Sequence, residues 1–464
     1  MHDKPKPEGE SDRYSHRCRG KRMSSGALQV IGAGLAGCEA AWQASQRGVH
    51  VDLFEMKPNR KSPAHHRDDF AELVCSNSFR ADRPENAVGL LKEEMRRLGS
   101  LIIGSADRSR VPAGGALAVD RDEFSGLVTS AIKNHPLITV HHCEMTEIPV
   151  DKTVIIATGP LTDDGMFDSI NKAVGNHSLH FFDAAAPIIG EDGIDRGIVF
   201  AASRYGKGGD DYLNCPMNED EYRLFYDALV HAELADVKDF DKETVFEGCM
   251  PIETMAKRGY DTIRYGPLKP VGLIDPRIGR MPYACVQLRQ DDRNASMFNL
   301  VGFQTRLKFS EQERVFRLIP GLQDVEFIRF GVMHRNTYLD SPKVLSRYYS
   351  LIENPNVFIA GQITGVEGYV ESAGSGLLAG IYAAHEILGR PLPSPLSDKA
   401  MLGAMAAYVS DVRIQNFQPM NANFGILPLP DTKIRGKKDR NLAYAQRALE
   451  EVERFHALLF QNRD

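Results

Sequence analysis

Near the start of the chain, apolar and polar positions follow a strand–helix–strand order. The apolar run at 28–31 is typical of a buried strand. A helical pattern follows it, carried by Ala40, Ala41, Trp42 and Ala44. A second apolar run covers 49–54 and ends at Glu55. This order predicts one β-α-β unit of a Rossmann-like α/β fold.

A glycine-rich turn with the spacing G-x-G-x-x-G joins the first strand to the helix. Its first glycine permits a tight turn, the second lets the backbone approach a pyrophosphate, and the third lets helix pack on strand. The helix N-terminus offers N–H groups to phosphates, and an acid about 20 residues further on suits ribose hydroxyls. We therefore expect a dinucleotide to be bound by Gly32, Ala33, Gly34, Leu35, Ala36, Gly37 and Glu55.

Further helices are indicated by apolar residues at helical spacing in the middle and at the end of the chain. The first two patterns lie at 90–98 and 124–132, and the last two at 401–411 and 441–460. A basic loop separates the last two patterns. The chain is therefore expected to finish in helices.

Two later stretches look like the rest of a cofactor domain. The strand in TVIIATGP (153–160) ends in Ala-Thr-Gly. This ending is typical of the point where the chain of a two-domain flavoprotein leaves the dinucleotide-binding domain, although an ordinary buried strand also fits. At 356–380 a strand runs into a glycine-rich turn and a helix of small residues, which suits close approach to a cofactor or tight helix packing. The cofactor contacts expected there are Gly361, Gln362 and Gly368.

These patterns together predict an α/β protein with a Rossmann-like cofactor domain, an inserted mixed α/β domain and C-terminal helices. We expect the cofactor domain to be discontinuous, at 27–160 and 336–464, with the insertion at 161–335. The polar segment 1–26 has no apolar core of a secretory signal, and we expect it to be disordered. The insertion has no second G-x-G-x-x-G unit, so a nicotinamide cofactor would have no Rossmann domain of its own. It would have to bind directly at the site of the flavin.

Composition and charge narrow the class of protein. The 464 residues are 42% hydrophobic and 25% charged, without the roughly 18-residue apolar run of a membrane span. A net charge of −6 argues against bulk nonspecific nucleic-acid binding but leaves room for a local basic patch. The seven scattered cysteines contain no C-x-x-C, so we expect no metal site, and free thiols favour the cytoplasm.

Five motifs occur in one order along the chain: GAGLAGCEAAWQ, LVCSNSFR, EGCMPIE, GVMHRNTYL and GQITGVEGYVESA. Together they resemble the folate- and FAD-dependent tRNA (uracil-5-)-methyltransferase family, which forms ribothymidine at the T-loop uridine (position 54) of bacterial tRNA. The resemblance implies FAD as a tightly held cofactor, 5,10-methylenetetrahydrofolate as carbon donor, NADPH or NADH as reductant, and tRNA as partner. It also implies two active cysteines, which map onto Cys75 and Cys249.

The chemistry explains why two thiols would be needed. A thiolate that adds to C6 of uracil makes C5 nucleophilic, and a base must then remove the C5 proton. The flavin can both carry the one-carbon unit and supply the reducing hydride. We expect Cys249 to be the nucleophile and Cys75 the base or alternate thiol, and the reverse assignment stays open. Tyr369 is expected beside the flavin, in a stacking, hydrogen-bonding or packing role.

Other contacts are predicted on side-chain chemistry alone. His334 and Arg335 suit a folate ring and a carboxylate or phosphate. A phosphate-binding stripe is expected from Lys433–Arg440, Arg96–Arg97 and Lys257–Arg264, although each is equally typical of a solvated face.

Three other functions compete with methylation of tRNA. The first is the related flavoprotein that modifies wobble uridines, whose chains are longer and carry a C-terminal helical domain. The second is a flavin oxidoreductase with Cys75 and Cys249 as a redox pair, and the third is an RNA-binding flavoprotein without catalysis. A uridine of ribosomal RNA is also an open target, because the flavin and thiol motifs would be the same.

Overall fold

The computed structural model describes residues 26–461 apart from 176, 207–208, 236–249 and 431–433, and gives only the backbone at 178–183, 334–335 and 460–461. The segment expected to be disordered therefore lies outside the described residues, except for Gly26.

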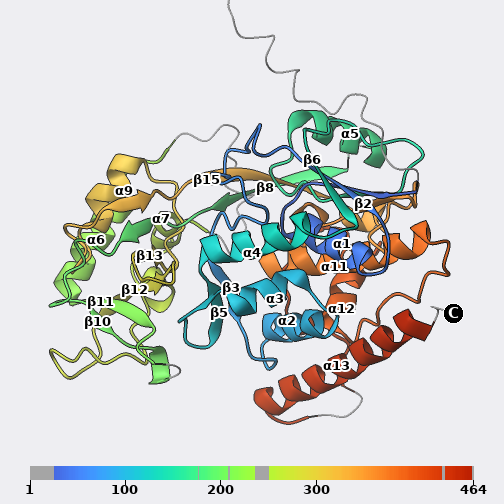
Figure 1. The fold of residues 1–464 in the computed structure, drawn as a ribbon. Helices are drawn as coiled ribbons and strands as arrows, with labels where there is room; N and C mark the ends of the chain where they lie inside the picture. The colour runs from blue at the N-terminus through green and yellow to red at the C-terminus, as the bar shows by residue number, and fades with distance from the viewer. Residues whose placement is uncertain (1–25, 176, 207–208, 236–249, 431–433, 462–464) are drawn as a thin grey trace, which may run out of the picture.

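A five-stranded parallel sheet forms the centre of the larger part of the molecule (Figure 1). Its order is β16-β7-β1-β2-β6, and every neighbouring pair is parallel. The strands are β1 (Leu28–Ile31), β2 (Val51–Glu55), β6 (Ile138–His142), β7 (Val154–Ile156) and β16 (Val357–Ile359). The four strands β1, β2, β7 and β16 are buried along their whole length, as their continuous apolar sequences predict.

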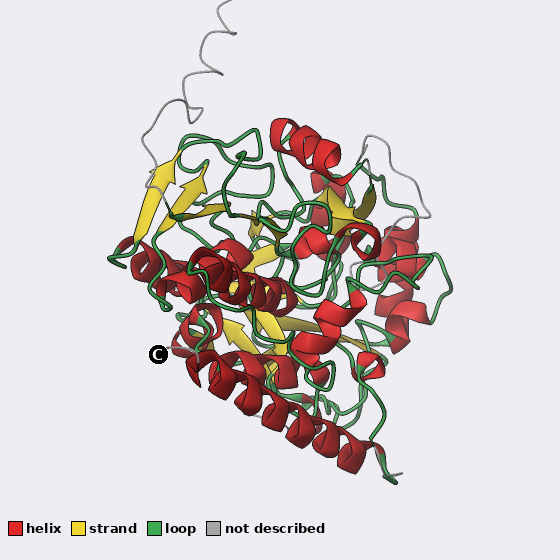
Figure 2. Cartoon of the chain, turned by 90° about the vertical axis from the view of Figure 1, so that its right-hand side faces the viewer, coloured by secondary structure: helices red, strands yellow, loops and turns green. Residues whose placement is uncertain are grey.

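Helices cover this sheet, and the long C-terminal helix lies along their outer side (Figures 1 and 2). The helices are α1 (Leu35–Ser45), α2 (Ala87–Arg97), α3 (Leu101–Arg108), α4 (Arg121–Lys133), α5 (Asp164–Val174), α10 (Ser341–Val344), α11 (Tyr369–Ile387), α12 (Met401–Tyr408) and α13 (Lys437–Gln461). The helices predicted from apolar spacing at 90–98, 124–132, 401–411 and 441–460 are confirmed as α2, α4, α12 and α13. α13 buries one apolar stripe that includes Ala448, Val452 and Phe455.

The small residues of α11 let it pack directly on α1. A Cβ added at Gly376 would lie 2.2 Å from the carbonyl oxygen of Ala36, and one at Gly380 would lie 2.5 Å from that of Ala40. Side chains at these two glycines would therefore push the helices apart. Tight packing accounts for both positions.

A six-stranded sheet of order β10-β11-β12-β13-β9-β14 forms the second part of the molecule, with antiparallel neighbours (Figure 1). Its strands are β9 (Ile188–Gly190), β10 (Phe200–Ala201), β11 (Tyr212–Met217), β12 (Ala284–Gln290), β13 (Met297–Leu300) and β14 (Phe327–Arg329). Its helices are α6 (Glu219–Val230), α7 (Ile252–Ala256), α8 (Thr262–Tyr265) and α9 (Phe309–Phe316). This part has its own apolar core, which runs from Ala186 to Val325.

A two-stranded antiparallel ribbon joins the two parts: β8 (Ser178–Ala184) and β15 (Met333–Leu339). It runs between them in Figure 1. A small sheet of order β3-β5-β4 lies near α2 and α3; its strands are β3 (Ser78–Ala81), β4 (Arg110–Val111) and β5 (Ala116–Val119). The α/β class with a Rossmann-like sheet is confirmed, and the domain boundaries at 160/161 and 335/336 stay a prediction.

A helix able to cross a bilayer is missing from the described part of the chain, because none there combines sufficient length with sufficient apolar character.

A buried carboxylate ties α2 to α12. Glu94 is fully buried and accepts hydrogen bonds from the backbone N–H groups of Met401 (2.7 Å) and Leu402 (2.9 Å). Burial raises the pKa of Glu94 to about 8, from 4.5, despite these two donors. The unfolded chain thus ionises this group at lower pH than the folded chain does.

Glu94 is therefore expected to make the folded state less stable as pH rises from 4.5 to about 8. In that window the unfolded chain binds fewer protons than the folded chain. Glu94→Gln removes this dependence and leaves one N–H group at the start of α12 without its acceptor. In urea unfolding, the variant should have a lower free energy of unfolding than wild type at about pH 5.5. This difference in free energy of unfolding should narrow by a few kcal/mol towards pH 8. A difference that is constant with pH would contradict this assignment.

Candidate functional site

A cavity opens at the carboxyl edge of the parallel sheet. This is where ligands bind in doubly wound α/β proteins. Most of the predicted cofactor contacts line it: Gly32, Ala33, Gly34, Leu35, Ala36, Glu55, Gly361 and Gln362. The Ala157–Gly159 turn predicted from TVIIATGP and the predicted catalytic residue Tyr369 also line it.

Gly37 and Gly368, also predicted as cofactor contacts, are not among the residues that line this cavity. A Cβ at Gly37 would lie 1.8 Å from the carbonyl oxygen of Gly32, so this glycine serves the contact between α1 and the turn. Gly368 has φ +119° and precedes α11, where a Cβ would lie 2.3 Å from the Glu371 carboxylate. Close packing therefore accounts for the absence of a side chain at both positions.

The walls fit a dinucleotide at the turn between β1 and α1. A Cβ at Gly34 would meet no atom within 4 Å, which leaves room for a pyrophosphate. α1 begins after Gly34 without a side-chain cap, so its first N–H groups are available to phosphate oxygens. The Glu55 carboxylate accepts hydrogen bonds from the N–H groups of Ala33 (2.8 Å) and Lys57 (3.0 Å), which fix its orientation. Its remaining lone pairs can accept ribose hydroxyls.

Cys75 lies in a loop that Tyr369 holds beside this cavity. The Tyr369 hydroxyl oxygen accepts hydrogen bonds from the backbone N–H groups of Cys75 (2.8 Å) and Ser76 (3.1 Å). The Cys75 sulfur lies 3.9 Å from the carbonyl oxygen of Ala184. Burial, together with the nearby Cys75, raises the pKa of Tyr369, so its hydroxyl keeps its proton. The structure therefore brings two of the three predicted catalytic residues together.

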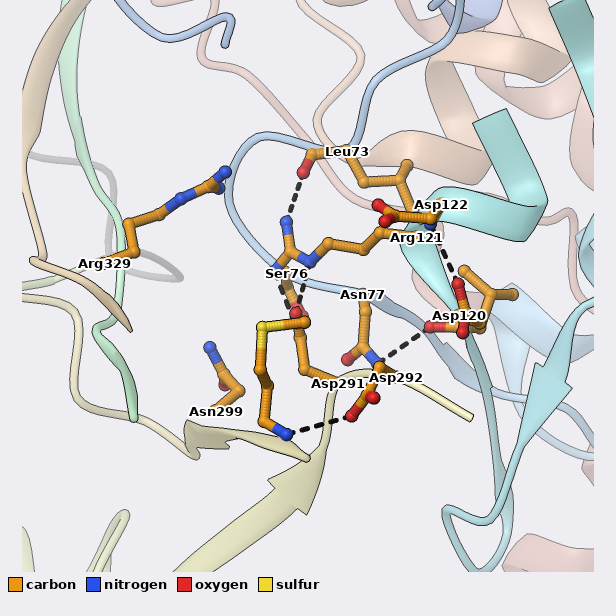
Figure 3. A network of polar contacts seen from close by, with 12 residues as sticks. Leu73, Ser76, Asn77, Asp120, Arg121, Asp122, Asp291, Asp292, Asn299 and Arg329 are labelled. Atoms are coloured by element: carbon orange, nitrogen blue, oxygen red, sulfur yellow. Dashed lines mark hydrogen bonds and ion pairs between the residues drawn. The ribbon is translucent and has the colours of Figure 1, made fainter. Parts of the chain in front are cut away.

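Two arginines, the largely buried Arg121 (Figure 3) and the buried Arg289, fix the same loop, and sequence reasoning missed both. Arg121 donates to the carbonyl oxygen of Leu73 and pairs with Asp291. Arg289 donates to the Ser76 hydroxyl (2.7 Å) and the Asn77 side chain (2.9 Å). Both guanidinium groups interact electrostatically with Cys75, and nearby positive charge favours a thiolate. One signal in the sequence could have revealed Arg289: it is an arginine at a buried position of the apolar strand β12.

Cys249, the third predicted catalytic residue, lies outside the described residues. The five-residue helix α7 begins shortly after it, following Pro251. Cys143 lines the cavity and is disulfide-bonded, which corrects the expectation that the cysteines are free thiols. Cys38, Cys215 and Cys285 are buried thiols.

The other predicted contacts are less well placed by the structure. His334 and Arg335 lie on β15 opposite residues 183 and 182, and the structure describes only their backbone. Arg96 pairs with Asp82 and Asp107, and Arg97 with Glu93 and Glu453, so these two cations are engaged in the fold.

The remaining predicted phosphate contacts are partly exposed. Lys257 is exposed, while the Arg264 guanidinium lies 4.1 Å from the centre of the Tyr283 ring. Lys433 is outside the described residues, and exposed basic residues of that segment are Arg435, Lys437, Lys438 and Arg440. Within the described ranges, no group of three or more His, Cys, Asp or Glu side chains is placed to hold a metal ion.

For the methyl transfer that the five motifs imply, Tyr369→Phe is expected to leave FAD bound and to lower the rate at least about tenfold. The change removes the oxygen that accepts from the N–H groups of Cys75 and Ser76, and an unsatisfied buried donor costs about 1–3 kcal/mol. The loop that carries Cys75 would then lose its fixed position. The measurement is single-turnover methylation, with FAD content from absorbance. Phe79→Leu, which changes a ring 5.9 Å from Tyr369 without touching these bonds, is the control. Equal activity in Tyr369→Phe and wild type would contradict the positioning role.

Comparisons with known proteins identify the family. The model of the family described as glucose inhibited division protein A matches residues 27–391. Relatives named methylenetetrahydrofolate–tRNA-(uracil-5-)-methyltransferase TrmFO include those of Acetivibrio thermocellus (60% identical, over 91% of this chain and 97% of the relative) and Brevibacillus brevis (57%, over 93% and 99%). The relative from Desulforamulus reducens is 56% identical over 92% of this chain and 97% of its own.

Two crystal forms of Aquifex aeolicus GidA share the fold, each with a TM-score of 0.66. Their sequence identity is 15% and 16%, over 94% of this chain and 74% and 77% of theirs. This chain thus matches the TrmFO relatives nearly end to end, whereas the GidA chains extend beyond it. The resemblance predicted from five motifs is confirmed, and the chain belongs to the glucose inhibited division protein A family and to the methylenetetrahydrofolate–tRNA-(uracil-5-)-methyltransferase family.

Proposed function

We propose that this protein methylates C5 of a tRNA uridine, with methylenetetrahydrofolate as carbon donor, FAD as bound cofactor and NADPH or NADH as reductant. The observation that carries the proposal is identity of 56–60% to TrmFO relatives over nearly the whole of both chains. We propose the T-loop uridine as the target, ribothymidine as the product and the cytoplasm as the place of action.

The residues around the cavity support this chemistry. Bound FAD would supply the one-carbon carrier and the reducing hydride. Arg121 and Arg289 place two positive charges near Cys75, which favours the thiolate needed either to attack C6 or to remove the C5 proton. Tyr369 holds the backbone of that loop at the cavity wall. Cys249 is proposed as the second thiol on its motif alone.

For the RNA we propose the exposed basic segment around α8, together with the start of α13. Lys257, Lys269 and Arg280 are exposed in the first, which extends the predicted Lys257–Arg264 stripe. Such side chains can neutralise RNA phosphates even on a chain of net negative charge. A T-loop base must also leave its stack to reach the cavity.

The test is to incubate the purified yellow protein with unmodified tRNA transcript, methylenetetrahydrofolate and NADPH, and to measure ribothymidine by nucleoside mass spectrometry. The expected result is one methyl group at the T-loop uridine, none without folate, and none in a transcript with cytidine at that position. NADPH turnover without RNA and without ribothymidine would favour the flavin oxidoreductase. Bound RNA without methylation would favour the non-catalytic flavoprotein, and a methylated ribosomal RNA fragment alone would change the target.

A further inference from the structure

A second cavity borders the loop that carries Cys75. Its walls come from the start of α4 and from the second sheet, including Ile188, Asp291 and Arg329. Leu73 lines this cavity, its neighbour Val74 lines the cofactor cavity, and Glu72 lines both. The two cavities therefore meet at this loop.

The carboxylates that line the second cavity are all engaged within the fold. Backbone N–H groups donate to Glu72, Asp120 and Asp292, and arginines pair with Asp122 and Asp291. Each of these carboxylates therefore already has a hydrogen-bond or ion-pair partner within the protein.

Arg329 is the exception among the charged groups of this cavity. The other two arginines are paired, Arg67 with Asp69 and Asp122 and Arg121 with Asp291. Arg329 makes one long hydrogen bond, 3.4 Å, to the carbonyl oxygen of Val74, and among the described residues no carboxylate lies within ion-pair distance of it.

The charges around Arg329 are mixed, and in the described part of the chain none of them forms a direct ion pair with it. The side chain reaches from β14 towards the Cys75 loop and is partly buried (Figure 3). The like charge of Arg121 and the carboxylates of Glu72 and Asp291 act on it without a direct ion pair. A partly desolvated guanidinium without a direct ion pair keeps N–H donors free for a charge-assisted hydrogen bond, so an anionic ligand would complete this site.

We propose that Arg329 and the second cavity bind the anionic tail of a co-substrate, either the carboxylates of the glutamyl tail of methylenetetrahydrofolate or the diphosphate of the nicotinamide cofactor. This inference rests on the proposed function. The reactive ring of each co-substrate must enter the cofactor cavity, while its charged tail must stay outside the apolar walls. The guanidinium fork matches carboxylate and phosphate oxygens, and the cavity begins where the two spaces share Glu72.

The experiment compares Arg329→Gln with wild type, with Arg329→Lys and with Arg196→Gln as controls. Arg196 is an exposed arginine of the same sheet region, paired with Glu191, and is not among the residues that line the cavity. One arm measures the KM for methylenetetrahydrofolate with one and with three glutamyl units, and the calorimetric affinity for p-aminobenzoylglutamate. The other arm measures the rate of anaerobic flavin reduction against NADPH concentration, without folate or RNA.

Arg329→Gln is expected to raise the KM or the half-saturating concentration of one co-substrate about tenfold or more, since a charge-assisted hydrogen bond is lost. Arg329→Lys should keep most of the affinity, and Arg196→Gln all of it. A change in the folate arm assigns the glutamyl tail, and a change in the reduction arm assigns the diphosphate. Wild-type values in both arms would overturn the inference, as would a change confined to the KM for tRNA. Absence of methylation in the wild type would instead overturn the proposed function, while the calorimetric and reduction arms would still test the site.

Discussion

Cys75→Ala is expected to reduce methyl transfer to tRNA by a factor on the order of a thousand or more, while FAD stays bound and NADPH still reduces it. Loss of a nucleophile or its paired base typically has effects of this size. The substitution removes the sulfur from a loop that is held by Tyr369, Arg121 and Arg289. None of these hydrogen bonds involves the Cys75 sulfur. The measurement is single-turnover formation of ribothymidine, with the flavin spectrum followed separately.

Cys285→Ala is the matched control, because it also removes one thiol from the described part of the chain. Burial raises the pKa of Cys285 to about 12, so this side chain stays a neutral thiol within the second sheet. The control should methylate like wild type. Activity in Cys75→Ala comparable to this control would remove Cys75 from the chemistry.

Covalent capture of tRNA that contains 5-fluorouridine separates the roles of Cys75 and Cys249. A fluorine at C5 blocks proton removal, so the thiolate that attacks C6 stays attached to the RNA. If Cys249 is the nucleophile, Cys249→Ala should lose capture and Cys75→Ala should keep it. The opposite pattern would reverse the assignment, and capture by both variants would contradict the two-thiol scheme.

Most residues predicted to contact the cofactor line one cavity because the determinants of their positions are local. The turn, the helix start and Glu55 lie within one β-α-β unit, and spacing along the chain fixes their positions in space. The same reasoning favoured cofactor contact for the small residues of α11, although close packing also requires small residues. The distance from Gly376 to Ala36 settles that position as packing.

The surroundings of Cys75 depend on long-range contacts that spacing cannot give. Tyr369 contacts Cys75 across 294 positions of sequence, and Arg289 contacts Ser76 across 213. Arginine is common on protein surfaces, so neither Arg121 nor Arg289 looked special until the second sheet was placed against the loop. Cys75 itself was found only because its motif matched a family.

Gly37→Ala is expected to yield protein largely without FAD and destabilised by at least about 2 kcal/mol. The added methyl would lie 1.8 Å from the carbonyl oxygen of Gly32 and 3.4 Å from the Ala157 side chain, so α1 would have to move away from the turn. That movement displaces the helix N-terminus from the phosphate position. FAD content after purification and thermal unfolding of the apoprotein measure the two effects.

Two other glycines separate packing from cofactor contact. Gly34→Ala adds a methyl group that meets no protein atom within 4 Å, so the apoprotein should unfold like wild type while FAD binds more weakly. Gly126→Ala, at an exposed position within α4, should leave FAD binding unchanged and add about 1 kcal/mol of stability from helix propensity. If Gly37→Ala behaved like Gly126→Ala, the close contact between α1 and the turn would not control FAD binding. If Gly34→Ala bound FAD as wild type does, the open space beside Gly34 would not be the pyrophosphate site.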